Sequence, residues 1–325
     1  MTDLPVVYAP VLVIAADGLG SFVQALGAVA AIRIHHPGAR VILLAAANTV
    51  DFAVGSPFVD EVWADEQHSW RAWRAARTFR DRLRGAGFAR VYDLDGGDIG
   101  RRIFRLMYGW RVDAARRATI QWSGEIAGAL FGDPIAGQAS LHRWDRLAAQ
   151  LKRAGVPELT PVDLTWVASR VTGFSLPFRM TEPFTMIVTD GPHRNSAQGW
   201  PPDRICVLAE RIASDGAVPV LVGLTAAPDL VAAVQAVVPR AVDLTGRANI
   251  SDLVFLAWAA RGAVGCDTGL MHLFAAADCR AVVLYDASSD PALSGQRGRG
   301  VIILRRQRLA DIPVGEVAAA LRQKR

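Results

Sequence analysis

The sequence predicts an α/β protein of two domains, each built on a mainly parallel sheet. Its 325 residues exceed what a single hydrophobic core usually serves. Short apolar runs alternate with stretches of helical periodicity along most of the chain, which is typical of βαβ units. A proline-rich stretch without periodicity, residues 160–183, interrupts the alternation as a linker would. We therefore predict domains over residues 1–165 and 184–325, joined by a linker over residues 166–183.

The elements of the first half follow from apolar runs of strand length, each succeeded by a turn and a helical pattern. These runs predict strands over residues 11–16, 40–44, 59–64 and 90–94. The stretches that follow them predict helices over residues 21–35, 48–54 and 69–85. The first apolar run is explained by a strand better than by a signal peptide, because a basic flank and a cleavage site are missing.

The same alternation restarts after the linker. Apolar runs predict strands over residues 184–189, 218–223, 241–244, 263–266, 281–285 and 301–304. Helices are predicted over residues 202–214, 228–237, 251–260, 270–277 and 314–323. Pro202 suits the first turn of its helix, and the last helix ends in basic residues that suit a C-terminus. Two such domains imply a cleft, with ligands beyond the carboxyl ends of the strands.

Composition excludes several classes of protein. An uninterrupted apolar run of about 18 residues is missing, so we expect a cytoplasmic chain without a transmembrane helix. Cys206, Cys266 and Cys279 are odd in number and lack metal-ligand spacing, so we expect core residues rather than a disulfide or a zinc site. Dedicated nucleic-acid motifs are also missing, and the net charge of +5 is modest, so no nucleic-acid partner is expected.

One helical stretch carries clustered basic residues. In "WRAWRAARTFRDRLR", Arg71, Arg74 and Arg77 recur at helical spacing with aromatic residues between them. The stretch is either a solvated helix face or a cationic surface that meets an anionic partner or a membrane.

The first strand runs into the turn "AADGLGSFVQ". Gly18 and Gly20 allow close approach of a ligand, and the next helix directs free N–H groups at the turn. The dinucleotide-binding pattern fails at Val23, and no acid follows the second strand, which disfavours a dinucleotide cofactor and a dehydrogenase. Asp17 before the glycines and Ser21 after them are both candidates for chemistry.

Two further strand-to-helix junctions carry polar residues. The loop "TDGPHRNSAQGW" offers His193, Arg194 and Gln198 as donors to a diphosphate, unless it is only a polar surface loop. The segment "CDTGLMHLFAAA" runs from a strand into a helix. Its Asp267 and Thr268 either cap that helix or flank an anion site at its N-terminus.

With these residues the chain resembles glycosyltransferase family 9, the heptosyltransferases of the lipopolysaccharide inner core. The most specific matches are "CDTGLMHLFAAA" and the downstream "SSDPALSG". The glycine turn, "FVDEVW", "VYDL", "QWSG", "GWPPDR", "PVLVG" and "DLTGR" support it in family order along nearly the whole chain.

The resemblance implies a GT-B architecture, in which two Rossmann-like domains face each other across a cleft. The N-terminal domain would hold a lipopolysaccharide-core or similar anionic glycolipid, and the C-terminal domain a nucleotide sugar, ADP-heptose in much of the family. The transfer would invert the anomeric carbon and need neither a metal nor a cofactor. The protein would then work at the inner face of the inner membrane, with the arginine helix in peripheral contact.

The resemblance also implies roles for individual residues. The donor would be held by Asp267, Thr268, Gly269, Leu270 and His272, with backbone near Thr245 and Gly246 approaching the base. His193 and Arg194 would face the phosphates, and Gly18, Gly20 and Gln24 would lie on the acceptor side.

Two positions depart from the family pattern. Ser21 stands where the family carries its catalytic aspartate, and Gln198 stands where it usually carries a lysine. A serine is a poor general base, and loss of a positioned base costs roughly 10² to 10⁴ in rate. Asp17, four residues earlier, either replaces this base or only caps the helix. The alternative is a non-catalytic paralogue that binds a nucleotide sugar, a glycolipid or a partner transferase.

Overall fold

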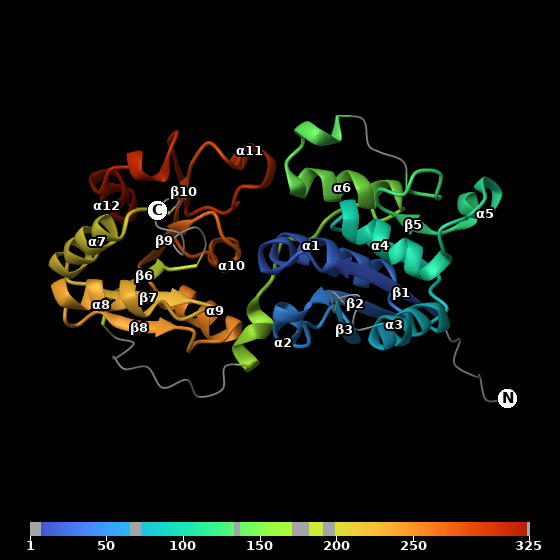
Figure 1. The fold of residues 1–325 in the computed structure, drawn as a ribbon, viewed down its shortest axis with the longest axis horizontal. Coiled ribbons are helices and arrows are strands. Elements are labelled where there is room, and N and C mark those ends of the chain that lie inside the picture. Colours follow the sequence, from blue (N-terminus) through green and yellow to red (C-terminus); the bar gives the residue numbers. More distant parts are fainter. Residues whose placement is uncertain (1–7, 66–72, 133–136, 171–181, 191–198, 324–325) are drawn as a thin grey trace. The chain divides into compact units, whose positions relative to one another are not determined.

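The computed structural model describes residues 8–65, 73–132, 137–170, 182–190 and 199–323. The chain forms two compact units, Met1–Asp163 and Leu164–Arg325, here called unit 1 and unit 2 (Figure 1). Most of the expected linker, at residues 171–181, lies outside the described residues.

Unit 1 is built on a five-stranded parallel sheet with the order β3-β2-β1-β4-β5. Its strands are β1 (Tyr8–Ala15), β2 (Ala39–Ala46), β3 (Glu61–Asp65), β4 (Arg90–Asp93) and β5 (Trp122–Ser123). The helices are α1 (Leu19–His35), α2 (Val50–Ala53), α3 (Trp73–Gly85), α4 (Gly97–Tyr108), α5 (Ala114–Thr119) and α6 (Arg143–Arg153). The sequence did not predict β5, α4, α5 and α6.

Unit 2 is built on a six-stranded parallel sheet with the order β11-β10-β9-β6-β7-β8. Its strands are β6 (Phe184–Val188), β7 (Val218–Gly223), β8 (Val242–Thr245), β9 (Gly262–Cys266), β10 (Ala281–Tyr285) and β11 (Val301–Arg305). The helices are α7 (Pro202–Ser214), α8 (Pro228–Val237), α9 (Ile250–Ala259), α10 (Gly269–Ala276), α11 (Pro291–Ser294) and α12 (Val314–Arg322). Each predicted strand and helix of this unit is present, with shifts of one or two residues at some ends.

The strand order of each sheet reverses direction at one point. In unit 1 the order reverses between β1 and β4, and in unit 2 between β6 and β9. Both sheets therefore have the doubly wound topology, in which ligands bind beyond the carboxyl ends of the strands at the reversal. The residues that follow β1, β4, β6 and β9 are consequently the first candidates for function.

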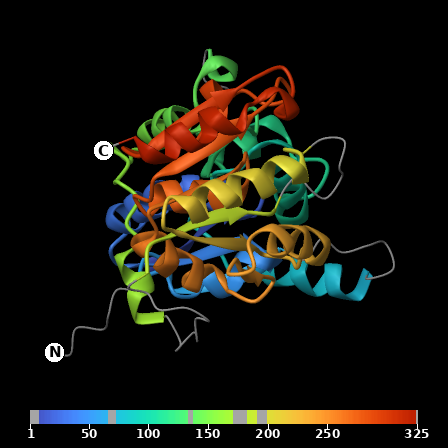
Figure 2. The ribbon, with the colours of Figure 1, turned by 90° about the vertical axis from the view of Figure 1, so that its left-hand side faces the viewer.

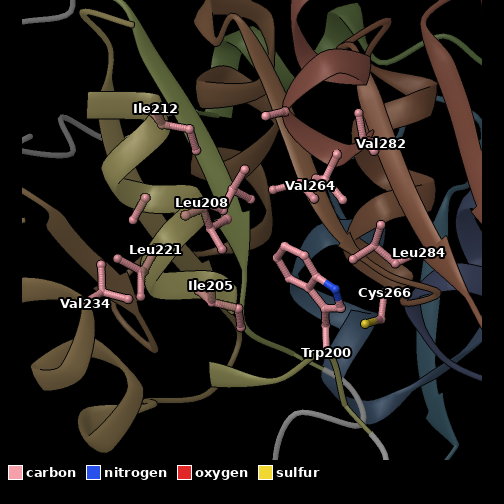
Figure 3. Close-up of a cluster of buried hydrophobic side chains, with 14 of the residues drawn as sticks. Trp200, Ile205, Leu208, Ile212, Leu221, Val234, Val264, Cys266, Val282 and Leu284 are labelled. Carbon is pink, nitrogen blue, oxygen red and sulfur yellow. The ribbon is translucent and has the colours of Figure 1, made fainter. Parts of the chain in front are cut away.

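The core of unit 2 fixes these strand ends. Helices α7, α8 and α12 cover one face of the sheet (Figure 2). The side chains of Leu208, Leu221 and Val264 meet there, and Trp200 fills the same cluster (Figure 3). The Trp200 indole N–H donates to the Ile312 carbonyl at 3.1 Å, which anchors the start of α7 to a distant part of the chain.

Cys266, at the end of β9, belongs to this core (Figure 3). Burial raises the pKa of its thiol to about 12, so the side chain stays uncharged at neutral pH. The residue therefore packs as a small apolar group, and Cys206 and Cys279 are likewise free thiols.

Candidate functional site

In unit 1, Asp17 lies directly beyond β1 and its side chain is exposed. The Ser21 hydroxyl, one turn into α1, donates to Asp17 Oδ2 at 2.9 Å. The helix cap is Gly18, with φ +113°, a conformation that favours glycine, and no side chain caps the helix. Asp17 therefore presents a carboxylate at the strand reversal, with one oxygen held by Ser21.

The backbone beneath Asp17 is fixed by Asp95, which follows β4. Asp95 Oδ2 accepts the backbone N–H groups of Ala16 and Asp17, the latter at 3.1 Å. Its other oxygen lies 3.1 Å from the Arg143 guanidinium of α6, and the two side chains are only 2% and 11% exposed. Burial raises the pKa of Asp95, while the Ala16 N–H and Arg143 oppose that shift. This buried pair sets where the Asp17 carboxylate stands.

Asp93, the last residue of β4, is buried at the same carboxyl end of the sheet. Its Oδ1 accepts the Gly96 N–H at 2.9 Å. Its Oδ2 is buried and has no hydrogen-bond partner among the described residues. Burial raises the pKa of this carboxyl, the Gly96 N–H opposes the rise, and the nearby Asp95 and Glu125 carboxylates add to it, so that the pKa is about 7. The geometry suits a carboxylic acid that is protonated below neutral pH.

Gln24 and Gly20 lie on α1 near this edge. The Gln24 side-chain amide donates to the Gly20 carbonyl at 3.4 Å. Its Oε1 is buried and has no hydrogen-bond partner among the described residues. Gln24 therefore lies in this edge with a buried acceptor oxygen that bonds to none of the described residues.

In unit 2, Asp267 directly follows β9 and joins a polar network. Its Oδ1 lies 2.9 Å from the Tyr285 hydroxyl and accepts the Gln296 amide at 3.0 Å. The Nε2 atom of His272 stands 3.7 Å from the same oxygen. Burial raises the pKa of Tyr285, and the neighbouring Asp267 carboxylate raises it further, so the phenol remains a donor. The network fixes Asp267 and brings His272 beside it.

Thr268 is the N-cap of α10, yet its side chain makes no capping bond. Its hydroxyl oxygen is buried and has no hydrogen-bond partner among the described residues. The first helical bonds run from Met271 and His272 to the Thr268 carbonyl, at 3.1 and 3.3 Å. The N–H groups of Gly269 and Leu270 therefore precede the bonded turn, as at any helix start. A hydroxyl and two backbone donors converge on one end of α10.

Leu270 is 1% exposed as a whole residue, so its side chain belongs to the interior. The Thr245 hydroxyl is occupied, since it donates to Asp243 at 2.7 Å and accepts from the Ala227 N–H at 3.2 Å. Gly246 adopts φ +68°, and a Cβ there would come within 2.8 Å of the Ala226 nitrogen. Glycine is therefore required at this turn.

The structure leaves some of the predicted site residues undescribed and adds others that the sequence analysis did not name. His193, Arg194 and Gln198 lie outside the described residues, so the structure does not place them. The sequence interpretation missed five residues that the structure brings to the strand ends: Asp93, Asp95, Arg143, Tyr285 and Gln296. For Asp95 and Tyr285, the position at a strand end was a usable indication. Arg143 and Gln296 carry no local pattern.

Comparisons with known proteins agree with this topology. The sequence model of glycosyltransferase family 9 (heptosyltransferase) matches residues 133–310. The Escherichia coli ADP-heptose LPS heptosyltransferase II structure is 20% identical, with a TM-score of 0.70 over 96% of this chain and 97% of that chain. The E. coli heptosyltransferase WaaC structure with ADP is 18% identical, with a TM-score of 0.71 over 95% and 98%.

A family 9 glycosyltransferase from Veillonella parvula is 15% identical, with a TM-score of 0.71 over 98% of this chain and 97% of that one. None of the curated proteins matches the chain. The chain belongs to glycosyltransferase family 9, the heptosyltransferase family. The predictions of this family and of a GT-B fold with two Rossmann-like parallel sheets are confirmed. Among the described residues, no helix combines the length and apolar character needed to cross a bilayer.

The raised pKa of Asp93 predicts a pH-dependent stability. Between its ordinary pKa of 3.8 and its folded pKa of about 7, the folded chain keeps a proton that the unfolded chain has released. This contribution is therefore present at low pH and is lost as pH rises through 7, at up to about 1.4 kcal/mol per pH unit. Asp93→Asn should flatten the slope of unfolding free energy between pH 5 and 7 in urea titrations. Equal slopes in both proteins would contradict the assignment.

Proposed function

We propose that the protein transfers a heptose or related sugar from an ADP-linked donor to a lipopolysaccharide-core or similar glycolipid acceptor. The reaction inverts the anomeric carbon and needs no metal ion or cofactor. Family membership supports the transferase class, and the donors at the start of α10 support an anionic donor substrate. The WaaC structures with ADP and with ADP-2-deoxy-2-fluoro heptose show that proteins of this fold hold such donors.

The diphosphate of the donor is assigned to the N-terminus of α10. Free N–H groups at a helix start attract phosphate through both hydrogen bonds and the helix dipole. The unpartnered Thr268 hydroxyl adds a third donor, and His272 beside Asp267 adds a fourth. These groups stabilise the negative charge that develops on the leaving diphosphate.

The general base is assigned to Asp17. The acceptor hydroxyl oxygen forms a bond to the anomeric carbon, while the bond from that carbon to the diphosphate breaks. The hydroxyl proton passes to Asp17, and the nucleoside diphosphate leaves with the electron pair. Ser21 holds Oδ2 of Asp17 at 2.9 Å, which leaves Oδ1 for the acceptor. Serine at the family's aspartate position thus orients the carboxylate that takes over its task.

The second candidate function is a non-catalytic paralogue that binds a nucleotide sugar, a glycolipid or a partner transferase. It is favoured by Ser21 and Gln198, which replace two residues that the family uses. Under this hypothesis Asp17 only orders the turn. The purified protein would then bind ADP without transferring sugar. Moving the carboxylate with the exchange Asp17→Ser/Ser21→Asp would create activity that the natural protein lacks.

Asp17→Asn is expected to lower the transfer rate by roughly 10² to 10⁴, because the amide cannot accept the proton. The fold should be kept, since the Ser21 hydroxyl can still donate to the amide oxygen. Ser21→Ala is the matched control and should cost roughly 10-fold at most, the effect of one orienting hydrogen bond. The measurement is the rate of transfer from ADP-heptose, monitored through the release of ADP. Unchanged turnover in Asp17→Asn would refute the assignment.

Thr268→Val is expected to weaken ADP binding by roughly 10- to 100-fold, because a hydrogen bond to a charged phosphate contributes about 1.5–3 kcal/mol. The fold should tolerate the change, since this hydroxyl bonds to none of the described residues. Thr78→Val, on an exposed turn of α3, is the control. Calorimetric titration with ADP checks the prediction, and equal affinity in both variants would place the diphosphate elsewhere.

Peripheral contact with the inner membrane is assigned to α3. Arg74 and Arg77 lie on exposed turns of this helix, and Arg77 stands 3.7 Å from Asp81. Arg71 lies outside the described residues. The helix carries five arginines against one aspartate, so its surface should attract anionic lipid.

The charge reversal Arg74→Glu/Arg77→Glu should weaken partition onto phosphatidylglycerol vesicles by roughly 30-fold or more, because each basic residue near the surface contributes about 1 kcal/mol. The variant Arg247→Glu/Arg299→Glu makes the same charge change in unit 2. Cosedimentation checks the result. If both variants sediment with vesicles as the natural protein does, α3 is a solvated face.

A further inference from the structure

Unit 2 has a hollow near the amino ends of its strands, on the opposite side of the sheet from the carboxyl ends described above. The hollow measures about 490 Å³. Its wall includes Arg261 and Arg280, which directly precede β9 and β10. The proposed donor residues lie at the carboxyl ends of β8 and β9. A five-residue strand spans roughly 16 Å, and this length separates them from the hollow. The hollow is therefore distinct from the donor site.

Four arginines line this hollow against a single acidic residue. They are Arg211, Arg261, Arg280 and Arg322, and the acid is Asp215. Arg322 is paired with Asp215 through two hydrogen bonds of 2.7 and 2.9 Å. Among the described residues, the other three guanidinium groups have no carboxylate within ion-pairing distance.

Arg280 is the least ordinary of the four, because its side chain is deeply placed. The residue is 9% exposed. Within the part of the chain that the structure describes, its guanidinium makes one hydrogen bond, a long one of 3.4 Å to the Ala320 carbonyl. A buried cation with one weak bond is costly unless an anion compensates it.

The arginines also have a simpler explanation, in which they only satisfy carbonyls at helix ends. Arg211 and Arg322 lie in the last turns of α7 and α12, where cations suit the helix dipole. Arg261 donates to the Asp215 carbonyl at 3.4 Å. Each guanidinium carries five donors, however, and these bonds use one donor each in Arg261 and Arg280. Most of the donors therefore remain available to a ligand.

The shape and the remaining lining indicate the kind of ligand. A volume of about 490 Å³ falls within the range of small-molecule sites. Leu208, Ile212 and Leu321 form an apolar part of the wall. Guanidinium groups bind phosphate and carboxylate oxygens alike through pairs of parallel hydrogen bonds. A phosphate has enough oxygens to face two guanidinium groups at once, so a hollow lined by several arginines suits a phosphorylated group.

A second hollow, of about 540 Å³, shares two of its lining residues with the first. Arg261 and Arg280 line both hollows. The second hollow also contains Trp258, whose ring is partly exposed, and Asp278. The two guanidinium groups are therefore approachable from two sides, which suits a ligand larger than a single phosphate ion.

We propose that this hollow, named the arginine pocket for its four arginines, is a second anion site that binds a phosphorylated molecule. The phosphate contacts Arg261 and Arg280, and the rest of the ligand lies against the apolar wall. The source is either a free phosphate ester or a phospholipid headgroup. Because the pocket lies away from the strand reversal, its occupant does not compete with the sugar donor.

The test is calorimetric titration of the full chain with inorganic pyrophosphate. Arg211→Gln/Arg261→Gln removes two exposed pocket arginines, and Arg101→Gln/Arg111→Gln removes two exposed arginines of unit 1 as the charge-matched control. The pocket variant should bind pyrophosphate roughly 10- to 100-fold more weakly than the control. Thr268→Val should keep the pocket binding, which separates this site from the donor site. Equal affinity in the two double variants would overturn the proposal and leave the arginines as helix caps.

Vesicles distinguish the two sources of phosphate. Cosedimentation is measured with phosphatidylcholine alone and with phosphatidic acid added. If the pocket variant loses both pyrophosphate binding and the extra sedimentation on phosphatidic acid, the ligand is a lipid headgroup. If it loses pyrophosphate binding alone, the ligand is a free phosphate ester. Arg280→Gln should reproduce the same pattern, and a variant that binds pyrophosphate as the natural protein does would count against the pocket.

Discussion

The Asp95 carboxylate is the constraint on which the strand reversal of unit 1 depends. It accepts two backbone N–H groups from the turn after β1 and pairs with Arg143 of α6. One buried side chain thereby ties together a strand end, its neighbour and a helix. A buried carboxylate is tolerated when its lone pairs are satisfied in this way, and removal of a partner would leave an uncompensated charge. The exposed position of Asp17 follows from this arrangement.

The two units use the same topology for opposite electrostatic purposes. In unit 1 the buried carboxylate of Asp95 accepts the backbone N–H groups of the turn, and the Asp17 carboxylate stays exposed with one oxygen bonded to Ser21. In unit 2 Asp267 is engaged by Tyr285 and Gln296, so the start of α10 keeps its N–H groups and the Thr268 hydroxyl. One edge therefore offers a proton acceptor and the other offers hydrogen-bond donors. The proposed inverting transfer to a hydroxyl, with loss of a diphosphate, would use both.

The sequence predicts what depends on local periodicity and misses what depends on distant contacts. The apolar strands of both sheets and the Asp267 block were found because their patterns are contiguous. Helices α4 and α6 do carry apolar residues at helical spacing, such as Ile103 in α4 and Leu147 in α6, and the sequence analysis overlooked this periodicity. The bond between Ala16 and Asp95 joins residues 79 apart, and that between Gln296 and Asp267 joins residues 29 apart. A local sequence pattern cannot predict such pairs, because their two residues lie far apart in the chain.

Ser21 and Asp17 are better understood as a pair than as a loss and its replacement. Their side chains are in hydrogen-bond contact at 2.9 Å. An aspartate at position 21 would bring a second carboxylate to this contact, and two like charges so close cannot both ionise without a large cost. A carboxylate is therefore compatible with either position but not readily with both. The Ser21 hydroxyl instead orients the Asp17 carboxylate through a hydrogen bond, without adding a second negative charge at this contact.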